Sequence, residues 1–433
     1  MSNHQGKSGI QRQAARPGIR QRWPLAVLAC ALAAPQLSVT ALGQEPEGSY
    51  LPIPNPANDY RDAIDRIEGD YGPYATELSD LYLGLGQALF EGGEYEKALD
   101  ALNRGIMVKR VNSGPNSPEQ TNHLYLIANV ETLLGNLDAA DGALRNIYFV
   151  NAEHHGELSP EMLPVLERMY YWYLTTRPPG SDVSDYADYE RSIDMAEQMV
   201  KISEPALGPA DPVTAAAYRR LGEAQFQAVR YLLGQGMVLT MDAYVAVSSR
   251  TLDSASVVKV PVGRHYDSGR KAFRQYLEAL AQDPSKTPMD VAQAYADLGD
   301  WYLAVGKTRN AREHYEQAYQ VLAGNAEYAA MAENYLGQPK PVHFFAPPPE
   351  FLSHLENPLP AMNLDISMTV TSYGNVRYAQ VLNAPEEVPE DVLGDILRLL
   401  RETPFRPAMK SGELVTTKDF IWQFAILPPE NAS

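Results

Sequence analysis

The feature that most constrains the fold of this chain is a recurring spacing of small and large residues. A small residue is followed by a glycine seven positions later, by an alanine five beyond that, and by a large residue four further on. The stretches that share it are Gly86-Gly93-Ala98-Leu102, Ala128-Gly135-Ala140-Leu144 and Gly299-Gly306-Ala311-Tyr315. Two helices that cross closely need small residues at the crossing, and a tight turn between them favours glycine. The spacing predicts stacked helical pairs, because one pair cannot bury its apolar face alone.

The predicted helical region runs from residue 59 to 335 and holds about five pairs. Residues 162–174 have the spacing of a further first helix, and residues 189–202 that of its partner. In a later first helix, Val229 stands where the turn glycine is expected, and a β-branched residue resists positive φ. We therefore predict that this helix runs past the usual turn and that an insertion occupies residues near 229–265.

These units resemble the tetratricopeptide repeat (TPR) family. The best matches are Tyr82-Leu85-Gly86-Leu89-Gly93-Tyr95-Ala98-Leu102 and Tyr295-Leu298-Gly299-Tyr302-Gly306-Ala311-Tyr315-Ala318. The characteristic unit has about 34 residues, whereas the first two units here are offset by 42, so the loops are longer. The resemblance implies an α-solenoid whose inner surface is lined by first helices.

The same resemblance implies a groove that binds a peptide or protein partner. Positions lining it include the residue after each packing position, and two more residues lie one helical turn earlier on that face. The candidates are Gln87, Tyr125, Asn129, Tyr171, Arg219, Glu223 and Asp300. Their mixture of amide, phenol, acid and guanidinium suits an extended peptide or a partner helix. The alternative is a solvated face that binds nothing.

The last part of the chain changes from helical to strand periodicity. Prolines concentrated in residues 336–360 predict a semi-rigid linker. Beyond it, apolar alternation, a turn signal at Ser372–Asn375, helical spacing and a closing aromatic run predict a β-β-α-β unit over 361–429. The predicted fold class is therefore mostly α, with an α-solenoid followed by a small α+β domain.

This unit resembles the C-terminal domain of TonB-type energy transducers. The matching residues are Tyr373-Gly374-Asn375-Val376, Leu399-Leu400-Arg401, Phe405-Arg406-Pro407-Ala408, Gly412 and the closing strand. The resemblance implies a peptide-binding fold, with a sheet edge formed by Phe420, Trp422 and Phe424. Residues 420–426 contain no charge and no proline. They form either a covered strand or an edge that pairs with a partner. We expect segment 358–433 to fold without the repeats.

The N-terminal residues 1–43 have the order of a secretory signal peptide. Five basic residues and no acidic one precede an apolar run, and small residues lead up to Gly43. We predict cleavage there, then an extended Pro-rich arm over 44–58 and a periplasmic or secreted protein. Pro35 interrupts the apolar run before it could span a membrane. Contact with a membrane requires an uncleaved N-terminus or a lipid on Cys30, which lies in a weak lipoprotein-like context.

Charge and cysteine content narrow the function classes. Without residues 1–43 the chain would hold 31 basic and 54 acidic residues, a surface that repels phosphate backbones, so nucleic acid is not an expected partner. The same cleavage removes Cys30, which is the single cysteine, so thiol catalysis is not expected.

Motifs for catalysis, cofactors or metals are missing from the sequence. His154-His155, beside Glu153 and Glu157, lacks the spacing that puts two imidazoles on one helical face, so we expect a solvated loop there. There is no P-loop and no G-x-S-x-G motif. In the aromatic run 170–173, successive residues point 100° apart, so we expect most in the core and one or two lining a groove.

These features predict a non-enzymatic protein–protein interaction scaffold of the bacterial cell envelope, with no catalytic residue, cofactor or metal. The alternative is a TonB-like energy transducer or envelope transport accessory anchored at its N-terminus. The sequence leaves the identity of the partner and the oligomeric state open.

Overall fold

The computed structural model describes residues 56–176, 185–234, 242–248, 255–342, 362–384 and 390–426. The predicted signal peptide, Cys30 and most of the predicted arm lie outside these ranges. The first described helix, α1 (Pro56–Tyr71), begins three residues before the predicted start of the helical region. Proline is favoured at a first helical position, where its missing N–H costs nothing. Among the described helices, none is both long and apolar enough to cross a membrane.

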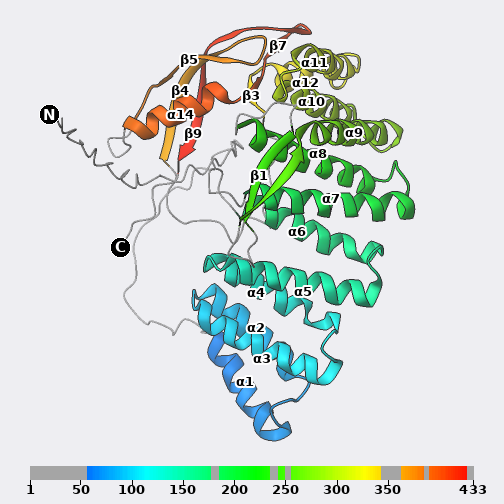
Figure 1. Ribbon diagram of the computed structural model, residues 1–433, viewed down its shortest axis with the longest axis vertical. Coiled ribbons are helices and arrows are strands. Elements are labelled where there is room, and N and C mark those ends of the chain that lie inside the picture. Colours follow the sequence, from blue (N-terminus) through cyan, green and yellow to red (C-terminus); the bar gives the residue numbers. More distant parts are fainter. Residues whose placement is uncertain are drawn as a thin grey trace, which may run out of the picture.

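Ten helices form five helical pairs that stack into a curved row (Figure 1). The pairs are α2 (Leu78–Glu91) with α3 (Tyr95–Ser113), α4 (Thr121–Leu133) with α5 (Leu137–His155), α6 (Leu163–Thr175) with α7 (Asp185–Leu207), α8 (Pro212–Gly234) with α9 (Val262–Gln282), and α10 (Pro288–Ala304) with α11 (Thr308–Ala323). Short 3-10 turns, η1 (Pro118–Gln120) and η2 (Pro160–Met162), lead into α4 and α6, and α12 (Ala329–Leu336) follows the last pair. The predicted solenoid of TPR-like helical pairs is confirmed.

The predicted spacing has the expected physical cause. The turn glycines Gly93, Gly135 and Gly306 have φ values of +75°, +75° and +74°, a conformation that other residues rarely adopt. At the helix crossing of the first pair, a side chain on Gly86 would come within 2.6 Å of Leu102. Small residues therefore let the two helices of a pair approach closely.

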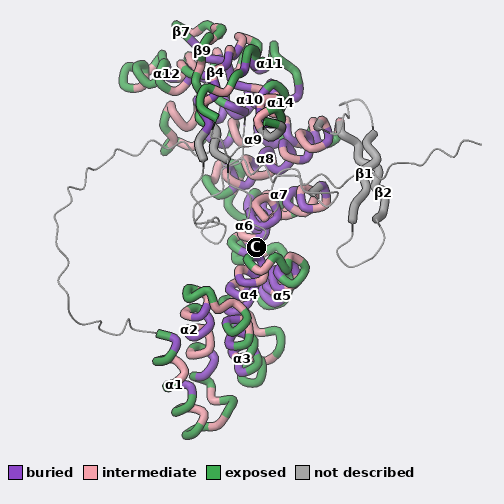
Figure 2. The backbone as a smooth tube through the Cα atoms, turned by 90° about the vertical axis from the view of Figure 1, so that its left-hand side faces the viewer, coloured by how far each residue is buried: buried purple, intermediate pink, exposed green. Residues whose placement is uncertain are grey.

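Buried residues follow the surfaces where neighbouring helices face one another (Figure 2). The run 170–173 in α6 is buried throughout, with exposed fractions of 0%, 8%, 6% and 4%. Of the two alternatives for these rings, core packing therefore holds and contact with a groove does not, and the expectation that not all four could be buried is wrong. Neighbouring helices on both sides of α6 accept its hydrogen bonds. Tyr173 donates to Asp141 of α5 at 2.7 Å, Trp172 donates to Thr132 of α4 at 2.9 Å, and Tyr170 donates to the Arg220 carbonyl of α8 at 3.1 Å.

The predicted continuation of the helix that lacks a turn glycine is present, because α8 runs to Gly234. Within the region of the predicted insertion, β1 (Asp242–Ser248) and β2 (Ala255–Pro261) pair as an antiparallel hairpin. Helix α9 starts directly after β2, at Val262. The insertion is therefore a β-hairpin between the two helices of the fourth pair.

The C-terminal domain is a small α+β unit. A three-stranded antiparallel sheet has the order β5 (Val376–Val381), β4 (Met362–Val370), β9 (Thr417–Ile426). Helix α14 (Glu390–Glu402) shares a core with it through Ile396 and Leu400. The short strands β6 (Phe405–Arg406), β7 (Met409–Lys410) and β8 (Glu413–Leu414) precede β9. The predicted β-β-α-β order is present with these additions, while the TonB relationship stays a prediction.

Strand β9 lies at an edge of this sheet, as one of the two sequence-based alternatives requires. Phe420 and Trp422 are half-buried and belong to the domain core, whereas Ile421 between them is 56% exposed. The side chain of Phe424 lies outside the described residues. The edge strand therefore has one covered face and one face open to solvent.

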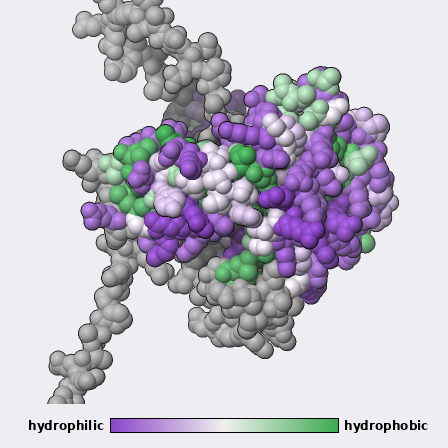
Figure 3. Space-filling view, turned by 90° about the horizontal axis from the view of Figure 1, so that it is seen from above, coloured by the Kyte–Doolittle hydropathy of each residue, from purple (hydrophilic) through white to green (hydrophobic). Residues whose placement is uncertain are grey.

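The C-terminal domain is docked onto the last helical pair. Within the predicted linker 336–360, strand β3 (Lys340–Pro341) pairs with β6. Met409 lies in the same core cluster as Trp301 of α10. Residues 340–341 of the predicted semi-rigid linker are therefore part of a strand pair. An isolated segment 358–433 would lack β3 and expose Met409. The end of the molecule in Figure 3 is mostly hydrophilic with small hydrophobic patches, as a terminal cap of a solenoid requires.

Candidate partner-binding site

The first helices α4, α6, α8 and α10 together carry a row of polar and aromatic side chains. We call it the first-helix seam and define it as Tyr125, Asn129, Glu167, Arg168, Tyr171, Arg219, Arg220, Glu223, Asp297 and Asp300. The contacts described below link these residues from helix to helix. Six of the seven predicted groove residues belong to the seam, so the spacing argument selected residues that the fold brings together.

At the α4–α6 end of the seam lies the guanidinium of Arg168, which has no counter-ion among the described residues. The Cζ of Arg168 is 4.4 Å from the centre of the Tyr125 ring, and its Nη2 donates to Oδ1 of Asn129 at 3.0 Å. No carboxylate of the described residues lies within ion-pair distance of it. Burial lowers the pKa of Arg168, since removal from water disfavours its charged form. The described residues therefore orient this cation without neutralising it.

The middle of the seam contains paired charges. Arg220 forms an ion pair with Glu167 and lies over the Tyr171 ring at 5.8 Å. Arg219 lies between two acids, with its Nε 3.4 Å from an oxygen of Glu223 and 3.3 Å from one of Asp297. These contacts leave Tyr171, Glu223 and Arg219 engaged within the protein.

Burial sets the protonation of the acids in this middle part. Glu223 is 7% exposed, and burial raises its pKa to about 7 although Arg219 opposes the shift. Burial also raises the pKa of Asp297, again against the attraction of Arg219. Two acids share one guanidinium here, so the middle of the seam binds a proton more readily than exposed carboxylates do.

The far end of the seam is closed by the C-terminal domain. Arg406 of β6 makes two hydrogen bonds to Asp300, from Nε to Oδ1 at 2.8 Å and from Nη2 to Oδ2 at 2.5 Å. Both side chains are buried, and the Tyr315 hydroxyl also donates to Asp300 at 2.8 Å. The prediction that Asp300 faces a partner is corrected, because a residue of the same chain occupies its carboxylate.

The remaining predicted residue lies apart from the seam. Gln87 is exposed on α2, and its amide donates to Glu91 of the same helix at 2.7 Å. Sequence reasoning missed Arg168, although it lies three residues before Tyr171, one helical turn earlier on α6. It also missed Arg406 as a partner of the solenoid, because no sequence signal pairs residues so far apart.

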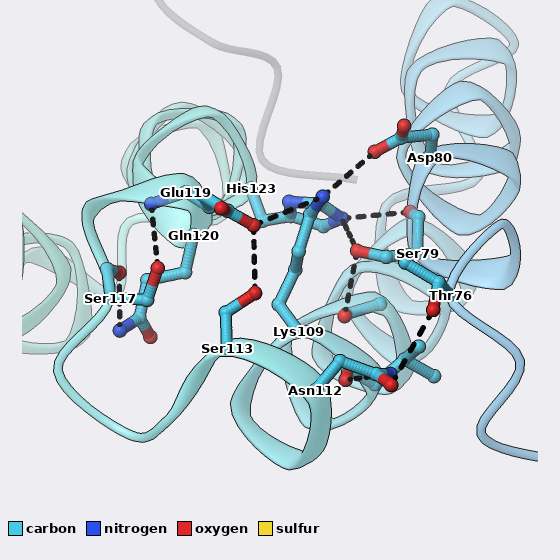
Figure 4. A network of polar contacts seen from close by, with 12 residues as sticks. Thr76, Ser79, Asp80, Lys109, Asn112, Ser113, Ser117, Glu119, Gln120 and His123 are labelled. Carbon is cyan, nitrogen blue, oxygen red and sulfur yellow. Dashed lines mark hydrogen bonds and ion pairs between the residues drawn. The ribbon is translucent and has the colours of Figure 1, made fainter.

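A second polar cluster joins the first two helical pairs (Figure 4). The Nε2 of His123 is 3.0 Å from the Ser79 carbonyl oxygen, which can only accept, so this nitrogen carries the proton. The Ser79 hydroxyl donates to the Gly105 carbonyl at 3.0 Å. The protonated Nε2 of His123 therefore cannot accept a proton from the Ser79 hydroxyl. Both side chains are buried. The cluster has no activated nucleophile and holds helices together.

The histidine pair singled out in the sequence lies on the last turn of α5 and not in a loop. His154 and His155 are exposed, with ring centres 4.6 Å apart, at a helix end where positive charge is favoured. Within the described ranges, no group of three or more His, Cys, Asp or Glu residues is placed to hold a metal ion.

No protein-family model matches the chain, and no curated protein matches its sequence. Solved structures similar to it include BtubC (BKLC) from P. vanneervenii, which is 14% identical with a TM-score of 0.37, over 62% of this chain and 89% of that one. A Podosopora anserina kinesin light chain protein with nearly identical TPR-like repeats is 15% identical with a TM-score of 0.38, over 57% and 97%. These similarities bear on neither the partner nor the activity of this chain.

Proposed function

We propose that this protein is a non-enzymatic interaction scaffold of the bacterial cell envelope that binds an extended, acidic segment of a partner protein at Arg168. The observation that carries the proposal is the guanidinium of Arg168, which Tyr125 and Asn129 orient and which meets no carboxylate among the described residues. The envelope location rests on the signal-peptide pattern of residues 1–43.

The surroundings of Arg168 favour a carboxylate as its ligand. The Tyr125 ring covers one face of the guanidinium, and Asn129 accepts one of its hydrogen bonds. A guanidinium has further N–H groups that can meet both oxygens of a carboxylate, which is the strongest pairing available to arginine. Because the side chain is already held in place, a partner spends little entropy in ordering it.

The edge of β9, with which no further described strand pairs, supports a second contact with the same partner. An extended segment adds to a sheet edge through backbone hydrogen bonds and is then held by alternate side chains. The alternative function, a TonB-like transducer, has less support. Its C-terminal domain would have to reach a distant partner, whereas Arg406 and the pairing of β3 with β6 hold this one against the solenoid.

A binding experiment with matched variants tests the proposal. The probe is a fluorescent oligoglutamate peptide, and its glutamine analogue is the ligand control. Arg168→Gln removes the charge, while Arg309→Gln removes an equally charged residue that is 91% exposed on α11. We expect Arg168→Gln to weaken binding by about tenfold or more, as for a lost hydrogen bond to a charged group. Equal affinities of the two variants, or equal binding of the glutamine analogue, would contradict the proposal.

A further inference from the structure

The hairpin of β1 and β2 belongs to no larger sheet in the part of the chain that the structure describes. Each strand has seven residues, and a two-stranded hairpin alone is at best marginally stable in water. Of the two strands, β1 makes the closer approach to the solenoid, near α7 and α9. β2 is thus the outer strand, and no described strand pairs with its other edge.

The register of the hairpin sorts its residues onto two faces, because successive residues of a strand alternate. One face combines Ala243, Val245 and Val247 of β1 with Val260, Val258 and Ser256 of β2. This face is almost entirely apolar. The hairpin therefore has an apolar face and an open edge, both of which need a neighbour.

Charge is scarce in these strands. Asp242 and Lys259 are the charged residues among the fourteen, whereas 21% of the whole chain is charged and its formal net charge is −18. Both lie toward the root of the hairpin, near α9. The segment 255–258 of β2 contains neither charge nor proline. Natural proteins usually protect such an edge with those residues or pair it.

We infer that the hairpin is a self-association surface, on which β2 pairs antiparallel with β2 of a second copy about a two-fold axis. The same surface then meets itself, as in most homodimers. Two acidic chains repel each other over most of their surface, so contact is favoured where charge is scarce. Pairing centred between Val257 and Val258 sets each Lys259 opposite Ser256 of the second copy, so like charges do not face each other. The product is a four-stranded sheet.

Sedimentation of the full chain over a range of micromolar concentrations tests this inference. We expect a reversible dimer for the natural sequence. Val258→Lys adds a like charge beside the two-fold axis and is expected to weaken the dimer at least about tenfold, a penalty of roughly 1.4 kcal/mol. Val213→Lys makes the same change at a 45% exposed position of α8 outside the hairpin and should leave the dimer intact.

A second variant guards against misreading a folding defect. In it, residues 242–261 are replaced by a short Gly-Ser linker, and circular dichroism confirms that the helices remain. Loss of the dimer in this variant and in Val258→Lys, with the helical signal unchanged, supports the inference. A natural chain that stays monomeric at every concentration, or a dimer that survives both changes, would overturn it.

Discussion

Each end of the first-helix seam has an arginine beside a tyrosine ring, but only one of the two arginines meets a carboxylate among the described residues. At the α4–α6 end, Arg168 lies over the ring of Tyr125 and meets an amide, and no described carboxylate neutralises it. At the α10 end, Arg406 lies 5.8 Å from the centre of the Tyr315 ring and is bound by both oxygens of Asp300. One arginine is half-buried and the other fully buried.

The difference shows how the chain uses one kind of contact for two purposes. Where the C-terminal domain supplies the arginine, the contact joins two parts of the chain and is sealed from water. Where the solenoid supplies the arginine, no described residue supplies an acid, and we propose that a partner molecule does so. The following predictions test this division between a structural end and a binding end of the seam.

The largest effect is expected from Arg406→Ala. It leaves Asp300 buried without its counter-ion, and breaking a buried ion pair in this way costs about 3–5 kcal/mol. Urea unfolding of the full chain measures the loss. An exposed ion pair contributes at most about 1 kcal/mol. If the free energy of unfolding of Arg406→Ala lies within that amount of the natural value, the α10 end of the seam does not have the structural role assigned to it.

The second effect concerns pH and Glu223, which lies between the two ends. Burial raises its pKa from the ordinary value of 4.5 to about 7, so the folded state holds the proton more tightly than the unfolded state. The associated stability is complete below pH 4.5 and is lost as pH rises through 7. Relative to the natural chain, Glu223→Gln should therefore gain stability with rising pH, by up to about 3 kcal/mol. A difference that stays constant from pH 5 to pH 8 would contradict the buried position of Glu223.

The third effect concerns the fit of the C-terminal domain against α10. Gly374 has φ +83°, and a side chain there would lie 2.6 Å from the Phe405 carbonyl oxygen and 2.9 Å from Leu303. We expect Gly374→Ala to cost about 1–3 kcal/mol through strain and overpacking. Gly394→Ala on α14 is the matched control, since nothing lies within 4 Å of the added carbon and alanine favours a helix. Thermal unfolding of both variants distinguishes a close contact from a general intolerance of alanine.

The smallest effect on stability is expected from Arg168→Ala. This side chain has no ion pair among the described residues, so its removal should cost under about 1 kcal/mol, although it abolishes the proposed binding of acidic peptides. Stability and peptide affinity are measured on the same sample. A loss comparable to that of Arg406→Ala would mean that Arg168 supports the fold and that the two ends do not differ.

The spacing of residues in the sequence was enough to predict the helical pairs and most of the seam. Turn glycines such as Gly93 can be recognised in the sequence because only glycine adopts a positive φ easily. Gly86 can be recognised because only a small residue permits the close crossing of the two helices of a pair. The same periodicity placed Tyr125 and Asn129 on one face of α4. Local rules of this kind act within one helical pair, so a single sequence displays them.

Tertiary structure decided which seam residues are bound by another part of the same chain and which remain available to a partner. Asp300 and Asn129 occupy the same position in their repeats, yet Arg406 binds Asp300, whereas Asn129 accepts a hydrogen bond from Arg168, which has no ion pair among the described residues. That outcome depends on the docking of a domain whose arginine is 106 residues away from Asp300 in the sequence. Burial and charge pairing depend on everything packed around a group, including distant segments, and periodicity along the chain carries no record of those neighbours.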